Sequence, residues 1–209
     1  SLPAVGTFSS LDLLSEDIIA DGGTSDETGR IAEESGAIFL TAEKGRGNQL
    51  AAAANAARGD WLLFLHADTA LEPGWDAVVR AFIDDPGNAE RAGYFRYRLD
   101  DRSPGARWLE MLVALRCRLF RLPYGDQGLL ISRALYHRLG GFKPVPLMED
   151  VDLVRRVGRR RLTALPSAAV TSAVRYRRDG YLLRPLRNLC CLTLYFLGVP
   201  PRAIVKLYG

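Results

Sequence analysis

Acidic side chains follow two short apolar segments of this sequence. Asp21 comes after Asp17-Ile-Ile-Ala20, and Asp68 comes three residues after Trp61-Leu-Leu-Phe-Leu65. In an open α/β sheet, a carboxylate at the end of a buried strand lies beside the ligand cleft. Such a carboxylate can hold a hard divalent ion that keeps water ligands and binds a substrate diphosphate. The alternative for both residues is that they only cap the following helix.

A second acidic motif is the doublet Glu149-Asp150, which begins a predicted helix to about Val157. The doublet can cap that helix, or it can place a carboxylate that accepts a proton from an attacking hydroxyl, as a general base does. Asp126 and Gln127 lie between two glycines just before an apolar segment. They form either a simple turn or a polar wall of a site.

Basic residues supply two further candidate sites. Lys44 and Arg46 lie where Gly45-Arg-Gly-Asn-Gln-Leu50 begins a helix, an arrangement that favours anion binding. With Asp68 about 20 positions on, the segment imitates a dinucleotide-binding fingerprint, although Leu50 replaces its third glycine. Ten arginines and a single carboxylate occur from Arg155 to Arg187. Both segments can equally be solvated, and the arginines could also receive phosphate, nucleic acid or anionic lipid.

The elements that must position these residues alternate between strands and helices. Apolar segments at 17–20, 37–41 and 61–65 are separated by helical segments, which is typical of an α/β domain with a buried, mostly parallel sheet. The remaining pattern predicts a helix from Pro73 to about Ile83, strands at 92–99 and 128–131, helices at 107–122 and from Ser132, and an amphipathic helix at about 181–197.

Composition limits the class of protein. The chain has 209 residues, 48% of them hydrophobic, and a formal charge of +4. These values suit one globular domain and exclude disorder, collagen and coiled coil for the whole chain. Three cysteines without a CxxC pair predict neither a disulfide framework nor a zinc ribbon, so a reduced, cytoplasmic setting is expected. The longest apolar run, Leu189 to Val199, is too short to span a bilayer, and no secretory signal is visible.

Taken in order, the motifs resemble glycosyltransferase family 2, the inverting nucleotide-sugar transferases with the GT-A fold. The motifs are Asp21-Gly-Gly-Thr-Ser-Asp26, Gly47-Asn-Gln-Leu50 with Asn55, Phe64-Leu-His-Ala-Asp68, Gly140-Gly-Phe142 and Glu149-Asp150-Val-Asp-Leu153. The resemblance implies a Rossmann-like, mixed but mostly parallel sheet flanked by helices, in one domain over residues 1–209. The basic tail with Leu197-Gly-Val-Pro-Pro201 resembles the arsenosugar biosynthesis glycosyltransferases, a subgroup associated with radical SAM and selenodomain proteins.

The resemblance also implies residue roles. Asp150 would be the base that deprotonates the acceptor hydroxyl, with Glu149 beside it, and Asp68 would bind a divalent metal, Mg²⁺ or Mn²⁺. His66 stands where the family motif has its first aspartate, which weakens the expectation of metal dependence. Acceptor contacts would come from Asp126 and Gln127. The implied donor-binding residues are Asp21, Gly23, Asp26, Lys44, Arg46, Asn48, Ala67, Arg177 and Arg178.

The implied partners are a nucleoside-diphosphate sugar, with UDP favoured, and an unidentified acceptor. Donor binding would use about residues 1–70, acceptor binding about 71–180, and residues 181–209 would form the C-terminal amphipathic helix. Homodimerisation and peripheral membrane contact are further expectations, and no nucleic-acid partner is expected. The family's first strand does not occur in this sequence; either residues upstream supply it, or we expect impaired donor binding.

Two other function classes fit parts of the sequence. A dinucleotide-dependent oxidoreductase would use the glycine-containing segment, but Leu50 and the unused Glu149-Asp150 doublet disfavour it. A non-enzymatic basic protein would bind nucleic acid or anionic membrane through its arginines. Its affinity would fall steeply with salt and would not depend on Asp68 or Asp150.

Overall fold

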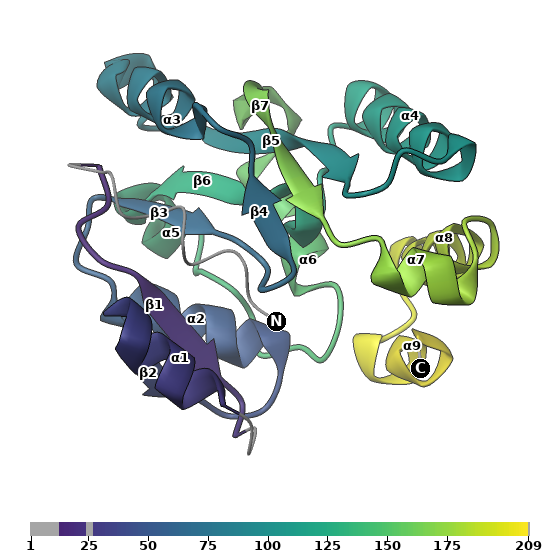
Figure 1. Ribbon diagram of the computed structural model, residues 1–209, viewed down its shortest axis with the longest axis horizontal. Coiled ribbons are helices and arrows are strands. Elements are labelled where there is room, and N and C mark those ends of the chain that lie inside the picture. Colours follow the sequence, from purple (N-terminus) through teal and green to yellow (C-terminus); the bar gives the residue numbers. More distant parts are fainter. Residues whose placement is uncertain (1–12, 24–26, 209) are drawn as a thin grey trace.

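The computed structural model describes residues 13–23 and 27–208. Its first part is a small parallel unit, in which a strand–helix–strand segment is followed by a second helix (Figure 1). The elements are β1 (Ile18–Asp21), α1 (Thr28–Ser35), β2 (Ile38–Thr41) and α2 (Arg46–Ala56). Helix α1 ends at Gly36, whose φ of 73° suits a left-handed cap that glycine adopts without strain. Residues 1–12, which the resemblance places around the family's first strand and helix, lie outside the described residues.

A five-stranded sheet forms the centre of the molecule. Its spatial order is β3 (Trp61–Phe64), β6 (Leu129–Ser132), β5 (Ala92–Leu99), β7 (Leu162–Thr171) and β4 (Thr69–Leu71). Strands β5 and β7 run parallel, whereas β3–β6, β6–β5 and β4–β7 are antiparallel. The α/β class with a mixed sheet is therefore confirmed, but the parallel pairings are a minority among the described strands. Buried strands have the same apolar pattern in either direction, so the sequence pattern could not distinguish them.

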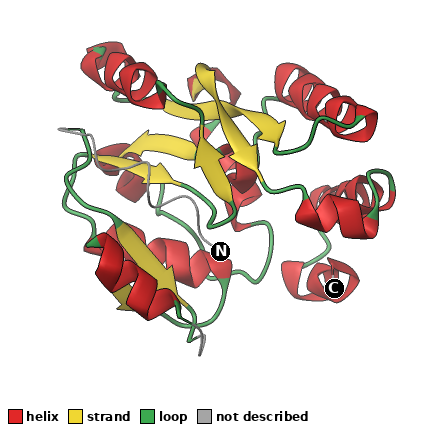
Figure 2. Cartoon of the chain, viewed as in Figure 1, coloured by secondary structure: helices red, strands yellow, loops and turns green. Residues whose placement is uncertain are grey.

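Apolar side chains alternate between the two faces of this sheet. Leu130 and Phe95 pack under α3 (Trp75–Asp84), while Leu129 and Ile131 pack on the opposite face. That opposite face is covered by helices α4 (Pro104–Phe120), α5 (Arg133–Arg138) and α6 (Glu149–Val157) (Figure 2). The two cores hold the sheet in place. The polar residues discussed below lie in the turn between β3 and β4, in the segment before β6, at the start of α6 and after β7.

Short 3₁₀ turns and three C-terminal helices complete the described chain. They are η2 (Pro86–Asn88), η3 (Gly125–Gln127), η4 (Arg159–Arg161), α7 (Val174–Asp179), α8 (Leu183–Phe196) and α9 (Pro201–Tyr208). The predicted amphipathic helix is α8, which packs on the core through Cys191 and Leu192. Within the described residues, no helix is both long and apolar enough to cross a bilayer.

Candidate active site

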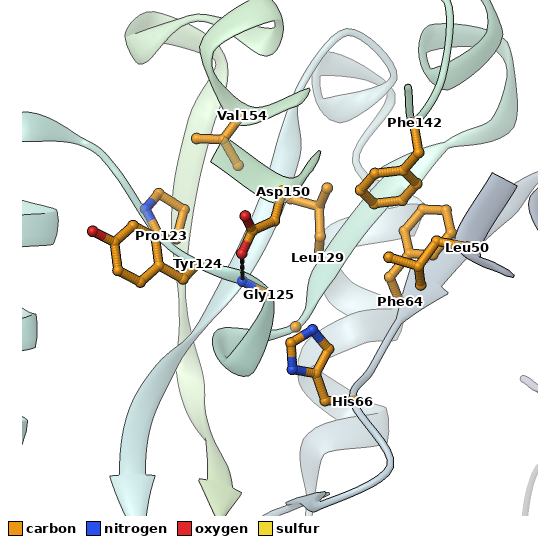
Figure 3. A pocket seen from close by; sticks show the side chains of 11 residues that line it. Leu50, Phe64, His66, Pro123, Tyr124, Gly125, Leu129, Phe142, Asp150 and Val154 are labelled. Carbon is orange, nitrogen blue, oxygen red and sulfur yellow. Dashed lines mark hydrogen bonds between the residues drawn. The ribbon is translucent and has the colours of Figure 1, made fainter. Parts of the chain in front are cut away.

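Asp150 lies in the first turn of α6 and faces η3. The turn before it places Met148 in the left-handed region, at φ 67°, so the helix begins abruptly. Asp150 Oδ2 accepts a hydrogen bond of 2.7 Å from the backbone N–H of Gly125 (Figure 3). This bond joins α6 to the loop between α4 and β6, and it fixes the carboxylate at the opening of a cavity.

His66 lies across Gly125 from Asp150, in the turn between β3 and β4 (Figure 3). A Cβ atom at Gly125 would be 2.4 Å from His66 Nε2 and 3.3 Å from Asp150 Oδ2, so only glycine fits between them. Burial, aided by the positive charge of Arg46, lowers the pKa of His66, although nearby aspartates oppose the shift. The imidazole is therefore neutral near pH 7 and can donate or accept a hydrogen bond.

Asp126 and Gln127 have different surroundings although they are neighbours. Gln127 is buried; its Nε2 donates to Phe95 O at 3.0 Å and its Oε1 accepts from Arg116 at 3.0 Å. These bonds hold η3 in place, and the predicted acceptor contact through Gln127 stays a prediction. Asp126 lines a cavity, and its buried Oδ1 has no hydrogen-bond partner among the described residues. Burial first, and then Asp150 and Asp68, raise the pKa of Asp126, while Arg116 and His66 lower it.

Asp68 is held at the start of β4. Its backbone C=O accepts a 3.0 Å hydrogen bond from Ser172 N–H, which joins the His66 turn to the end of β7. The Asp68 carboxylate is 4.0 Å from the Arg175 guanidinium. Among the described residues, no three His, Cys, Asp or Glu side chains converge on a metal position. Any ion at Asp68 would therefore need ligands from substrate and water.

Two adjoining hollows meet at His66, Tyr124 and Asp150. The apolar pocket is lined mainly by hydrophobic side chains and is drawn in Figure 3: Leu50, Phe64, His66, Pro123, Tyr124, Gly125, Gly128, Leu129, Phe142, Asp150 and Val154. The polar cavity is lined by Arg46, His66, Asp68, Tyr124, Asp126, Asp150, Thr171, Ser172, Arg175, Tyr176, Arg184 and Asn188. Asp150 thus lies at the boundary between the polar cavity, which suits a charged ligand group, and the apolar pocket, which suits the apolar face of a ring.

Glu149 is adjacent to Asp150 in sequence but lines neither hollow. Glu149 is 1% exposed, and within the part of the chain that the structure describes its buried Oε2 has no hydrogen-bond partner. Burial, followed by the negative charge of Asp150, raises the pKa of Glu149 to about 7. The Glu149 carboxyl therefore carries a proton over part of the neutral pH range.

Comparison with known proteins places this chain in a family. The sequence matches the family model for glycosyl transferase family 2 over residues 10–139, which is more than half of the chain. The chain belongs to glycosyl transferase family 2. A comparison of this family 2 chain with curated protein sequences found no significant match.

Solved glycosyltransferases share the fold of this family 2 chain. Staphylococcus aureus TarS 1–349, in complex with UDP-GlcNAc, is 16% identical with a TM-score of 0.58, covering 75% of this chain and 49% of TarS. Glucosyl-3-phosphoglycerate synthase from Mycobacterium tuberculosis, with Mn²⁺ and UDP-glucose, is 19% identical with a TM-score of 0.56, covering 90% and 70%. GalNAc-T7 with UDP, GalNAc and Mn²⁺ is 14% identical with a TM-score of 0.53, covering 75% and 37%. This chain therefore spans less than two thirds of TarS and GalNAc-T7, and the likeness confirms the GT-A class.

The predicted donor residues of the family 2 chain cluster mainly at the end of β1. Asp21 Oδ2 accepts a 2.7 Å hydrogen bond from Gly23 N–H, and Asn48 bonds to Lys44 O and Glu43 at 3.5 Å. These residues line neither hollow, whereas Arg46, from the same α2 start, lines the polar cavity. Ala67 is exposed beside Asp68, and the predicted contact at Asp26 lies outside the described residues.

The predicted diphosphate arginines are placed elsewhere. Arg177 lies 3.8 Å from Asp100, and Arg178 pairs with Asp179 at 2.7 Å; neither lines the polar cavity. Arg175 and Arg184 line it instead. The sequence indicated the arginine cluster but not which of its side chains face the polar cavity, because successive side chains of α7 are rotated by about 100° around the helix axis. Arg184 carried no signal in the sequence beyond the general density of arginines.

Proposed function

We propose that this family 2 glycosyltransferase transfers a sugar from a nucleoside-diphosphate sugar, with UDP favoured, to an acceptor hydroxyl with inversion. The observation that carries the proposal is the placement of Asp150, whose carboxylate is aimed by the Gly125 N–H where the polar cavity and the apolar pocket meet. Support for the donor class comes from neighbours of the same fold that were solved with UDP-sugars.

In the proposed reaction, Asp150 accepts the proton of the acceptor hydroxyl as its oxygen attacks the anomeric carbon. The bond from that carbon to the diphosphate oxygen breaks, and the nucleoside diphosphate leaves with the electron pair. Attack from the face opposite the leaving group inverts the anomeric centre. Arg46, Arg175 and Arg184 line the polar cavity and would offset the negative charge of the diphosphate.

A divalent ion, Mg²⁺ or Mn²⁺, fits this donor set in a limited way. Asp68 offers a partly exposed carboxylate on the wall of the polar cavity, and on the same wall the buried Asp126 Oδ1 has no partner among the residues that the structure describes. An ion of this class is commonly held by one or two carboxylates plus substrate phosphates and water. When bound, it would supply Lewis-acid stabilisation of the leaving diphosphate. Asp68 is the residue that we propose to hold it.

The proposal keeps the expected division of labour. Residues up to about 70 would bind mainly the donor, with Arg175 and Arg184 added from the C-terminal part, and Asp126 on the cavity wall would contact the acceptor. A reduced, cytoplasmic location is supported by the cysteines, because Cys117, Cys190 and Cys191 are all free. The arsenosugar biosynthesis subgroup stays a prediction from the sequence resemblance.

Calorimetric titration of the chain with UDP and GDP, each with and without Mn²⁺, tests the proposal. We expect saturable UDP binding that Mn²⁺ strengthens and that Asp68→Asn weakens by about tenfold or more. Asp60→Asn, an exposed carboxylate just before β3, is the matched control and should bind as the unmodified chain does. Binding of neither nucleotide by a folded chain, or binding unaffected by Asp68→Asn, would contradict the donor site.

A further inference from the structure

Helix α4 exposes an apolar stripe along its outer face. Its inner face is buried through Leu109, Val113 and Cys117. The outer face carries large hydrophobic side chains that are 41–61% exposed: Trp108, Met111, Leu115, Leu119 and Phe120. The first four recur at spacings of three and four, which places them on one side of the helix, and Phe120 is exposed at its C-terminal end. A row of large exposed hydrophobic side chains such as this one is uncommon on a surface that faces only water.

Helix α8 and its ends expose a second set of hydrophobic side chains. Cys191 and Leu192 pack on the core, and Arg184 and Asn188 line the polar cavity. The exposed set is 50–75% accessible and consists of Leu182, Leu183, Leu186, Leu189, Phe196 and Leu197. One side of α8 thus serves the cavity, and the other presents leucines outward.

The two helices lie on the same side of the molecule (Figure 1). At their beginnings, Tyr181 packs so closely on α4 that a Cβ at Gly105 would be 2.9 Å from its ring. At their ends, Arg159 donates a hydrogen bond to Leu119 O, and Arg155 lies 4.9 Å over the Phe196 ring. The starts of α4 and α8 therefore lie together, and their far ends contact neighbouring residues, Arg159 and Arg155. We call the outward side chains of both helices the outer apolar face.

The segments that carry the outer apolar face have an excess of positive charge. Residues 174–208 contain seven Arg and Lys but one carboxylate, Asp179, which is paired with Arg178 and Arg184. Residues 104–121 contain four arginines and one carboxylate, Glu110, which is paired with Arg107. The same segments therefore carry exposed leucines and aromatic rings together with exposed basic residues, among them Arg118, Arg202 and Lys206.

We propose that the outer apolar face docks on an anionic lipid bilayer. Leucine and aromatic side chains enter the boundary between headgroups and acyl chains, while arginines contact lipid phosphates. A two-fold contact between copies of this chain would set the same arginines against each other, which disfavours a dimer here. Since α8 also carries Arg184 and Asn188, docking brings the polar cavity within about one helix diameter, roughly 10 Å, of the lipid surface.

Vesicle co-sedimentation of the full chain tests the proposal. The probes are phosphatidylcholine vesicles with and without about one third phosphatidylglycerol. We expect binding to the anionic vesicles that is weakened by raised salt, and little binding to phosphatidylcholine alone. The triple variant Leu115→Gln, Leu186→Gln, Leu189→Gln should lower the partition coefficient by about tenfold or more. Thermal unfolding by circular dichroism establishes that each variant is folded.

The matched control removes apolar surface elsewhere, on β2. The double variant Ile38→Thr, Phe39→Thr changes side chains that are 45% and 39% exposed, and it should bind anionic vesicles as the unmodified chain does. Three results would overturn the proposal: no sedimentation with anionic vesicles, equal loss in both variants, or a dimer that the triple variant alone converts to monomer without vesicle binding. The last result would assign the face to a second copy.

Discussion

Asp150 Oδ2 accepts a hydrogen bond from Gly125 N–H across 25 residues of sequence, and His66 fills the remaining space beside Gly125. The first turn of α6, the η3 turn and the turn between β3 and β4 therefore meet at one backbone N–H group. The contact orients the Asp150 carboxylate. Because glycine has no side chain, no side-chain conformational entropy is lost at Gly125. Its role can be tested from each of the residues involved.

Replacing Asp150 with asparagine keeps the shape of the side chain and removes its basicity. The amide oxygen of the Asp150→Asn variant can still accept from Gly125, so the fold should persist, while turnover falls by about 100-fold or more. Release of UDP from UDP-glucose or UDP-GlcNAc, with water as acceptor, provides the readout. Asp152→Asn, on the same helix but paired with Lys143 and Arg156, is the control and should keep turnover near normal. Unchanged turnover in folded Asp150→Asn would exclude Asp150 as the base.

A methyl group at Gly125 should displace His66 or Asp150. Gly125→Ala places a Cβ 2.4 Å from His66 Nε2, so we expect a loss of about 1–3 kcal/mol in unfolding free energy and a fall in UDP release. Gly29→Ala on α1 meets only the Phe39 ring, at 3.9 Å, and should be neutral or slightly stabilising. Urea unfolding of both variants measures the difference. Equal free energies of unfolding would mean that the segments around Gly125 shift to accommodate the methyl group without strain.

Arg175 should contribute more to diphosphate binding than its neighbours in α7. Arg175→Gln removes a cation on the wall of the polar cavity, 4.0 Å from Asp68, and should weaken UDP binding by about tenfold. Arg178→Gln is the control, because that side chain is 78% exposed and pairs with Asp179. Calorimetric titration with UDP distinguishes them. A larger effect from Arg178 would restore the assignment that the sequence alone had favoured.

Glu149 should make stability fall as the pH rises. Its pKa is about 7 in the folded chain against an ordinary value of 4.5, because burial and Asp150 disfavour the charged form while Arg46 opposes them. Between these values the unfolded chain has released the proton and the folded chain retains it. The free energy of unfolding therefore drops by about 3 kcal/mol from pH 4.5 to pH 7 and is level above that.

Glu149→Gln tests this pH dependence. The free energy of unfolding of the variant should not fall over this pH range. In urea unfolding the variant should therefore become more stable relative to the unmodified chain between pH 5 and pH 8. Glu33→Gln, on the exposed side of α1, should follow the unmodified chain at every pH. Parallel curves for Glu149→Gln and the unmodified chain would show that the buried carboxyl does not titrate in this range.

Local pattern was sufficient for most individual elements. The acidic doublet and apolar spacing predicted the helix from Glu149 to Val157, and α6 has those bounds. The alternating segment at 92–99 is β5. Strand β7 was missed, because Leu162–Thr171 contains small residues and Pro166 instead of an apolar run. Its ten residues become a strand through pairing with β5 and β4, and those partners are distant in sequence.

The sequence by itself determined that carboxylates stand at Asp68, after a strand, and at Asp150, at a helix start, because strand ends and helix starts are local features; the structure places both on the wall of the polar cavity. Only the tertiary structure decided which cations share their cavity. Arg175 and Arg184 line it while Arg177 and Arg178 do not, since α7 and α8 are oriented by packing against Tyr181 and the core. It also decided that Glu149 is buried behind Asp150, because burial depends on what the rest of the chain places around a side chain.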